Sequence, residues 1–304
     1  MQGKPLNNSL ALYSILIGLP SLGFLNTALA GEQLLGYTQG AEPLPKGASE
    51  FYQIFTTRND KGKGTYHALD SKTEIEHGFT NRFSGSFAIT GHQINTNGLL
   101  IDGYLPQEKN KSFSFSGMEA EMKYAFLTPA LNDIGLSTTF GLSYDTVDSH
   151  SGQKKDTLSA DVGVQLQKYF MDGQLVWLNN ASMESTYAKR PAITGINDES
   201  VWPTTPEMEI ELTASTGISY RFTNNWSIGT EAVYQTEFET EVGQERWSLF
   251  AGPSIHYGDQ KFWATLTYLP QVVGGGERYP GQSRGLHLIE KTKYETKLKL
   301  GYNF

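Results

Sequence analysis

The feature that most constrains the fold of this chain is an alternation of side chains with a period of two. In residues 207–223, apolar, aromatic or threonine side chains recur at every second position from Met208 to Phe222, and polar residues or glycine stand between them. A helix would scatter these residues around its circumference, whereas a strand sorts them into two faces. Residues 133–147 and 157–170 show the same sorting. The pattern therefore predicts amphipathic strands.

Weaker runs of the same kind bring the expected number of strands to twelve. These runs cover 50–58, 65–79, 83–94, 113–127, 174–187, 226–236, 246–257, 261–270 and 286–304. Short turns at 80–82, 128–132, 171–173, 223–225 and 258–260 alternate with longer polar segments, namely 59–64, 95–112, 148–156, 188–206, 237–245 and 271–285. Short turns at one rim and long loops at the other are typical of an up-and-down transmembrane β-barrel. Since each alternating run corresponds to one strand, we expect an all-β, antiparallel barrel of about twelve strands.

The composition agrees with a barrel that spans a membrane. Aromatic residues make up 12% of the chain, and after the first 30 residues no segment reaches the ~18 consecutive apolar residues of a membrane-spanning helix. In the hydrocarbon layer every backbone polar group must be paired, which a closed sheet achieves. A soluble β-sandwich or ligand-binding barrel also has alternating strands. However, such a fold buries its apolar face and would not need aromatic residues at both ends of so many strands.

The first 30 residues have the features of a secretory signal peptide. Lys4 precedes an apolar stretch at 10–25, and Ala-Leu-Ala stands directly before Gly31. We expect cleavage after Ala30. The polar, turn-rich segment 31–49 is then expected to be a periplasmic lead-in to a barrel over 50–304, with a small plug inside the lumen as the alternative. The chain has no cysteine, so disulfides contribute nothing to its stability.

The net charge argues against nucleic acid as a partner. Loss of residues 1–30 removes one lysine and no acidic residue, so the formal charge moves from −8 to −9. An acidic chain lacks the basic surface that nucleic acid binding needs. The expected surroundings are instead outer-membrane lipid and lipopolysaccharide, and the expected location is the bacterial outer membrane.

If the apolar faces meet lipid, charged residues of both signs line the lumen. The candidates are Glu119, Glu121, Lys123, Asp161, Glu209, Glu211, Arg221, Glu231, Lys293, Glu295, Lys297 and Lys299. Such residues can select a small polar solute, as rings of charge do in channels. They can equally form a paired network that fills a narrow barrel. A pair between Glu209 or Glu211 and the lysines of the last strand is not expected, because those strands are not neighbours.

The chain ends in "YETKLKLGYNF", which we expect to be the closing strand, paired with the first strand near 50–58. Its alternation ends in Tyr302 and Phe304 and resembles the C-terminal signal by which the assembly machinery of Gram-negative bacteria engages outer-membrane barrels. Longer segments resemble a family of porin-like outer-membrane proteins without an assigned substrate. They are "HALDSKTEIEHGFTNRFSGSFAITGH" (67–92), "FSGMEAEMKYAFLTP" (115–129), "TGISYRFTNNWSIGTEA" (216–232), "FAGPSIHYG" (250–258) and "FWATLTYLPQ" (262–271). The resemblance implies fold and location and leaves the function open.

Three function classes follow, and a passive porin-like channel for small polar solutes is favoured. A closed structural or receptor-like barrel that binds a partner through its loops is the alternative. A lipid or peptide hydrolase is disfavoured: "GHQINTNG" (91–98) is similar to the His-x-Ser-Asn stretch of outer-membrane phospholipase A, but Ile94 replaces the nucleophilic serine, so His92 has no hydroxyl to activate. The six histidines show no metal-ligand spacing. We therefore expect no enzymatic activity, no metal and no cofactor.

Overall fold

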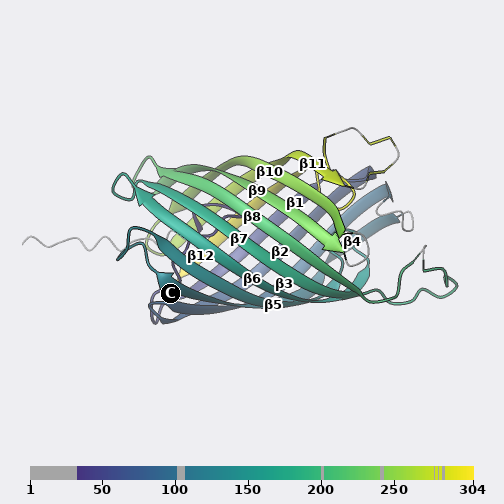
Figure 1. Cartoon of the computed structure of the whole chain (residues 1–304), viewed down its shortest axis with the longest axis horizontal. Helices are drawn as coiled ribbons and strands as arrows, with labels where there is room; N and C mark the ends of the chain where they lie inside the picture. Colours follow the sequence, from purple (N-terminus) through teal and green to yellow (C-terminus); the bar gives the residue numbers. More distant parts are fainter. Residues whose placement is uncertain are drawn as a thin grey trace, which may run out of the picture.

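The computed structural model describes residues 33–100, 107–199, 202–239, 243–276, 278–279, 281–282 and 285–304. In this part of the chain, twelve antiparallel strands form one closed barrel in which each strand pairs with its neighbours in sequence and β1 pairs with β12 (Figure 1). The expected fold class and strand number are confirmed. The expected signal peptide, residues 1–30, lies outside the described residues.

The strands agree with the expected runs, apart from their lengths. They are β1 (Ser49–Asn59), β2 (Lys63–Thr80), β3 (Phe83–Leu100), β4 (Gln107–Leu127), β5 (Gly135–Val147), β6 (Lys154–Phe170), β7 (Leu175–Lys189), β8 (Glu207–Arg221), β9 (Trp226–Glu239), β10 (Gly243–Gly258), β11 (Phe262–Gly276) and β12 (Tyr294–Asn303).

One expected loop is largely strand. Most of the segment 95–112 continues β3 and β4, where Asn95 pairs with Asn110 and Thr96 with Lys109. Apart from Leu99 and Leu100, the residues of this ladder are polar or glycine, so apolar periodicity does not reveal it. The hairpin therefore extends beyond the apolar part of the barrel wall.

The two rims of the barrel differ. The C-terminus and the connections β2–β3, β4–β5, β6–β7, β8–β9 and β10–β11 lie at one rim, called here the turn rim, on the left of Figure 1. The opposite rim, called here the loop rim, carries the two longest connections, β7–β8 and β11–β12. The alternation of loop lengths that the sequence predicts is present only in part, because strands extend through most of the expected loops 95–112 and 237–245. The β1–β2 and β9–β10 connections at the loop rim are therefore short, and the β4–β5 connection at the turn rim is longer than either of them.

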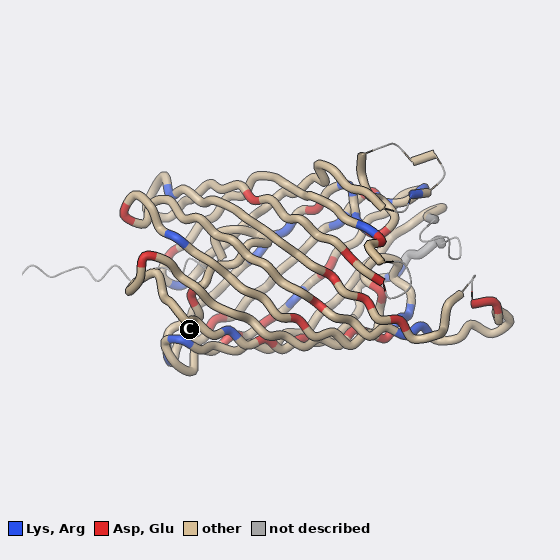
Figure 2. Tube along the Cα trace, in the orientation of Figure 1, with Lys and Arg blue, Asp and Glu red and all other residues tan. Residues whose placement is uncertain are grey.

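Apolar side chains cover the outside of the wall. Phe87, Ile89, Leu142 and Val162 are exposed along its middle, and Ile228 is exposed nearer the turn rim. Toward the strand ends, the exposed aromatic residues include Trp177, Tyr187, Tyr220, Phe222, Trp226, Phe262, Tyr268, Tyr302 and Phe304. Charged residues occur along the strands between the rims (Figure 2). Among the described residues, no helix has the length and apolar character needed to cross a membrane. An apolar belt with aromatic residues near its edges suits the hydrocarbon layer and its two interfaces.

The seam between β1 and β12 closes the barrel, with pairs that run from Glu50↔Asn303 to Asn59↔Tyr294. This confirms the expected pairing of the last strand with the first. Inside the seam, the indole of Trp263 lies against Gly301, where a Cβ would overlap the ring. The same indole donates a hydrogen bond to the Glu50 carboxylate. One buried side chain of β11 therefore joins β12 and β1.

Candidate functional site

Most of the N-terminal segment 33–48 lies inside the barrel, in the half of the lumen nearer the turn rim, and residues 45–47 are exposed. Its principal anchor is Glu231 of β9, whose carboxylate accepts hydrogen bonds from the backbone N–H groups of Gly36 (2.8 Å), Tyr37 (3.0 Å) and Thr38 (2.8 Å). The Thr38 hydroxyl donates a further bond at 3.1 Å. Glu231 and Thr38 are both buried. One carboxylate therefore satisfies three successive backbone donors of the inserted segment.

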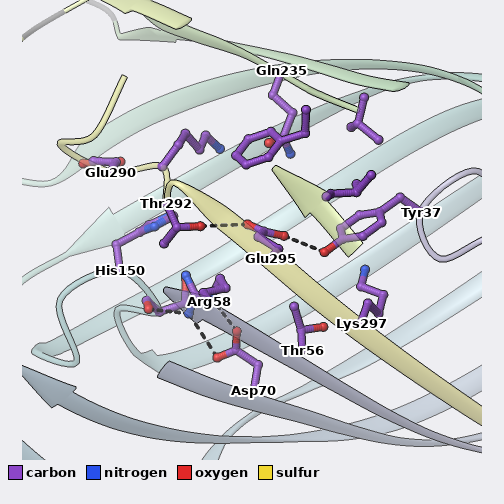
Figure 3. Close-up of a pocket in the computed structure, with 15 residues that line it drawn as sticks. Tyr37, Thr56, Arg58, Asp70, His150, Gln235, Glu290, Thr292, Glu295 and Lys297 are labelled. Atoms are coloured by element: carbon purple, nitrogen blue, oxygen red, sulfur yellow. Dashed lines mark hydrogen bonds and ion pairs between the residues drawn. The ribbon is translucent and has the colours of Figure 1, made fainter. Parts of the chain in front are cut away.

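Other contacts fix the same segment across the lumen. Leu35 packs against Val176 and Leu178 of β7. The Tyr37 hydroxyl donates to Glu295 at 2.6 Å, and the Lys297 ammonium lies 3.6 Å from the centroid of the Tyr37 ring (Figure 3). These contacts connect the segment to opposite parts of the wall.

This placement corrects the expectation of a periplasmic lead-in for residues 31–49. That expectation rested on the absence of an apolar pattern in the segment. The anchor is a set of backbone N–H groups on a lumen carboxylate, and such bonds leave no periodic trace in the sequence. The described part of the segment forms a plug, and residues 33–48 are called the plug below.

Two connections of the loop rim also fold into the lumen. The Ser149 carbonyl in the β5–β6 connection accepts hydrogen bonds from Arg58 Nη2 (2.6 Å) and the Tyr66 hydroxyl (3.1 Å). In the β11–β12 connection, Ile289 packs into the buried cluster of Tyr66 and Ile94. The lumen is thus narrowed from both rims.

The β11–β12 connection corrects two further expectations. The last strand was expected to begin at 286 but begins at Tyr294, because residues 286–292 turn inward. The Lys291 ammonium reaches Glu211 of β8 at 2.8 Å. A contact between the end of the chain and β8 was not expected, because β8 and β12 are not neighbours. An inward loop crosses the lumen and makes this contact without strand pairing.

Burial of these loops affects their titratable groups. Burial lowers the pKa of His150 well below its usual value, and the Lys61 ammonium lowers it further. Burial, followed by Arg246, lowers the pKa of His287 to about 4. Both imidazoles are therefore neutral near pH 7, as dense packing of the two loops requires.

Two adjoining cavities remain between the plug, the loops and the wall. The smaller has a volume of about 280 Å³ and is lined by the plug residue Tyr37 and by Glu295 and Lys297 of β12 (Figure 3). The larger has a volume of about 380 Å³ and is lined mainly by β2–β8 and the β5–β6 connection. Both are bordered by Asp70 and His150. Together they form a polar space within the lumen.

The structure places most of the charged candidates on the inward face of the wall. Lys72 contacts Glu119 at 2.5 Å, and Lys155 contacts Glu209 at 2.8 Å. Lys123 donates to the carbonyl of Gly40 in the plug at 3.1 Å. The other candidates with buried or half-buried side chains on strands are Glu121, Asp161, Glu211, Glu231, Glu295, Lys297 and Lys299. Paired charges thus occupy much of the lumen.

Two candidates lie elsewhere. Arg221 is the last residue of β8, and Lys293 precedes β12; both side chains are exposed. Both positions continue the inward alternation of their strands. However, β8 ends at Arg221, and β12 begins only after Lys293. Neither joins the charged groups around the two cavities.

Sequence reasoning missed a buried group on β1–β3. Arg58 contacts Asp70 at 2.6 Å, and the other oxygen of Asp70 lies 2.6 Å from His92 Nδ1. The alternation is weak in these strands, so their inward face is hard to assign from sequence. Among the described residues, no three His, Cys, Asp or Glu side chains are grouped so as to hold a metal ion.

A family model described as "Family of unknown function (DUF6662)" matches residues 27–304, which is nearly the whole chain. The chain belongs to this family. No curated protein matches the sequence of this DUF6662 member.

Solved structures show what the DUF6662 fold resembles. The COG4313 outer membrane channel from Pseudomonas putida F1 matches with a TM-score of 0.61 and 10% identity, over 87% of this chain and 98% of the channel. The β domain of the Bordetella autotransporter BrkA matches with a TM-score of 0.52 and 11% identity, over 85% of this chain and all (100%) of that domain. At these identities the likeness concerns the fold alone. Together with the apolar belt, it identifies an outer-membrane-type β-barrel.

Proposed function

We propose that this protein is a passive outer-membrane channel for small polar solutes, narrowed by its plug and two inward loops. The observation that carries the proposal is the polar space inside the barrel, where cavities of about 280 and 380 Å³ adjoin. A barrel that served only as a scaffold could fill this space with packed side chains. A chain of polar cavities along a lumen instead supports passage of hydrated solutes.

The plug would set the conductance. Apart from the peptide bond that continues into β1, its contacts are hydrogen bonds, packing against two apolar clusters and one cation–π contact. Segments held in this way can exchange between docked and released states. Solute would enter through gaps beside the plug or during its release.

Planar bilayer recording tests the proposal. The mature chain should give a small, fluctuating conductance, and a variant that lacks residues 33–45 should give a larger and steadier one. Retention of the heat-sensitive mobility shift of folded barrels on gels would show that the truncated variant assembles. Absence of conductance from both folded proteins would refute a channel function.

A closed, receptor-like barrel is the second candidate, and the occupied lumen favours it. The β7–β8 connection lies at the loop rim, and in its described part Trp202 is buried and donates to the Pro191 carbonyl at 2.9 Å. Arg190 and Glu207 close the base of this loop with two hydrogen bonds of 2.7 and 2.9 Å. A loop with such contacts can present a fixed surface to a partner. Folded protein without any conductance would support this candidate.

The proposal includes recognition of the closing strand during assembly. Tyr302 and Phe304 are exposed on the outer surface next to the seam. An exposed aromatic end of the last strand is accessible to the barrel assembly machinery before and after closure.

A further inference from the structure

Carboxylates follow one another across four neighbouring strands of the lumen wall. Asp161 of β6 pairs directly with Glu184 of β7, Glu184 with Glu211 of β8, and Glu211 with Glu237 of β9. Like charges in directly opposed positions of a sheet are destabilising. This acidic row, Asp161 to Glu237, therefore needs positive charge from another source.

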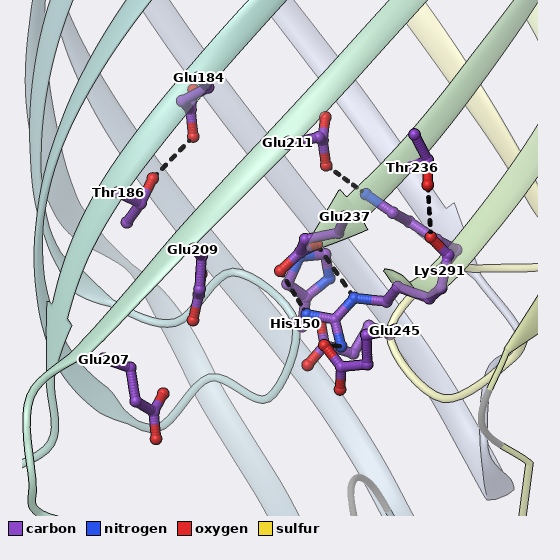
Figure 4. A network of polar contacts seen from close by, with 12 residues as sticks. His150, Glu184, Thr186, Glu207, Glu209, Glu211, Thr236, Glu237, Glu245 and Lys291 are labelled. Carbon is purple, nitrogen blue, oxygen red and sulfur yellow. Dashed lines mark hydrogen bonds and ion pairs between the residues drawn. The ribbon is translucent and has the colours of Figure 1, made fainter. Parts of the chain in front are cut away.

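Cations of the chain neutralise only the part of the row nearer the loop rim (Figure 4). Lys291 contacts Glu211 at 2.8 Å, and Arg246 Nε donates to Glu237 at 3.0 Å. Among the described residues, Glu184 accepts a hydrogen bond only from the Thr186 hydroxyl, at 3.0 Å. Within the described ranges, no Lys, Arg or His nitrogen lies within 4.0 Å of the Asp161 or Glu184 carboxylates. Negative charge is left uncompensated at this point.

The larger cavity opens on to this uncompensated charge. Glu184 lines it from β7 and Asp145 lines it from β5. Asp145 accepts a weak hydrogen bond from Thr90 at 3.3 Å, and in the part of the chain that the structure describes it has no cationic partner. A Cβ at Gly117 on β4 would overlap the Asp145 carboxylate, so the glycine makes room for it. Two carboxylates that have no cationic partner among the described residues thus line a cavity of about 380 Å³.

An independent feature of the same cavity is an unused hydrogen-bond acceptor. His92 lines the cavity, its side chain is only 2% exposed, and its Nε2 has no hydrogen-bond partner in the part of the chain that the structure describes. The short contact of 2.6 Å between Nδ1 and Asp70 places the proton on Nδ1. In the neutral ring Nε2 is then an acceptor. A buried acceptor without a donor indicates that a donor-bearing ligand belongs there.

We propose that the larger cavity binds a small organic cation with primary ammonium groups, held by Asp145 and Glu184 and by His92 Nε2. The assignment deepens the proposed channel function, since it names the class of solute that the lumen would favour. An ammonium group supplies positive charge for the carboxylates and N–H donors for the imidazole nitrogen. An anion would meet uncompensated negative charge, and a neutral diol would leave that charge unpaired.

A four-carbon series separates these cases, because its members share a length and differ in charge. The probes are 1,4-diaminobutane, 1,4-butanediol and succinate, titrated calorimetrically into the folded mature chain in detergent. Saturable binding of the diamine alone is expected. Equal binding of the diol or the dianion would overturn the proposal.

Two substitutions test whether Asp145 and Glu184 bind the diamine. Asp145→Asn and Glu184→Gln each remove one charge with little change in size, and each should weaken diamine binding about tenfold or more, the factor expected for one charge-assisted hydrogen bond. Asp133→Asn, at an exposed turn, makes the same change in net charge outside the lumen and should leave binding unchanged. An effect of Asp133→Asn equal to that of the lumen substitutions would contradict the assigned site.

A current measurement on the unchanged protein keeps the two proposals apart and needs no variant to fold. Under a gradient of 1,4-diaminobutane dihydrochloride, the reversal potential should show preference for the cation. Conductance with anion preference and no diamine binding would overturn the cation site and leave the channel standing. Binding without conductance would support the cation site and, if the variant that lacks residues 33–45 is silent as well, would refute the channel.

Discussion

Substitution of Glu231 by glutamine should release the plug while the barrel stays folded. The Glu231 carboxylate accepts one bond through Oε1, from Gly36, and three through Oε2, from Tyr37 and Thr38. A glutamine oxygen at the Oε2 position keeps three of these bonds in neutral form, and its amide then faces the Gly36 N–H, donor against donor. Loss of one bond to a charged group, with weakening of the others, costs about 3 kcal/mol. At 1.4 kcal/mol for each factor of ten, the docked state should lose a factor of about 100 against the released state.

Cysteine labelling measures this change, since the chain has no cysteine of its own. Ala41 is buried in the plug, so a cysteine at Ala41→Cys should react slowly with a membrane-impermeant maleimide. Adding Glu231→Gln should raise the labelling rate up to about 100-fold, in proportion to the released population. Glu121→Gln, which alters a lumen carboxylate that has no bond to the plug, serves as the control. Equal labelling rates with and without Glu231→Gln would refute the anchoring role of this carboxylate.

Three further outcomes are expected. Gly301→Ala should lower the free energy of unfolding of the barrel by about 1–3 kcal/mol, because the new methyl group overlaps the Trp263 indole. Urea titration followed by the gel mobility shift measures this loss, and an unchanged urea midpoint would contradict the close contact between Trp263 and Gly301. The β11–β12 loop should loosen as the pH falls from about 6.5 to about 4, because its packed state holds His287 at a pKa of about 4 and the unpacked loop takes up a proton near 6.5. Protease sensitivity of the loop should therefore rise across this window, and His287→Gln should flatten the rise. Deletion of Phe304 should reduce the amount of barrel in the outer membrane of expressing cells without abolishing refolding in detergent, whereas equal losses in both would indicate a purely structural role.

The wall of this barrel could be predicted from sequence, because its determinants repeat. Alternation along strands such as 207–221 reports directly which side chains meet lipid, and the spacing of the turns reports the order of strands. The pairing of β12 with β1 follows from closure and an even number of strands. Residues such as Glu211 could accordingly be placed on the inner face without any structure.

The contents of the lumen could not be predicted, for a physical reason. The plug is held by three backbone N–H groups on Glu231, and backbone donors are present at every non-proline residue. The contact of Lys291 with Glu211 depends on a loop that turns inward, and the acidic row depends on the relative register of four strands. In a single sequence, the residues that make these three contacts cannot be told apart from other polar residues.

The Trp263 indole at the seam has a consequence for the order of folding. Eleven of the twelve strand contacts around the wall join strands that are neighbours in sequence, whereas the seam joins the first strand to the last. Since the indole meets Gly301 on one side and Glu50 on the other, it can be buried only after both terminal strands have arrived. The fluorescence of this indole should thus change last during refolding, because in a partly paired sheet the ring remains in contact with water. Burial of Trp263 therefore reports that the barrel has closed.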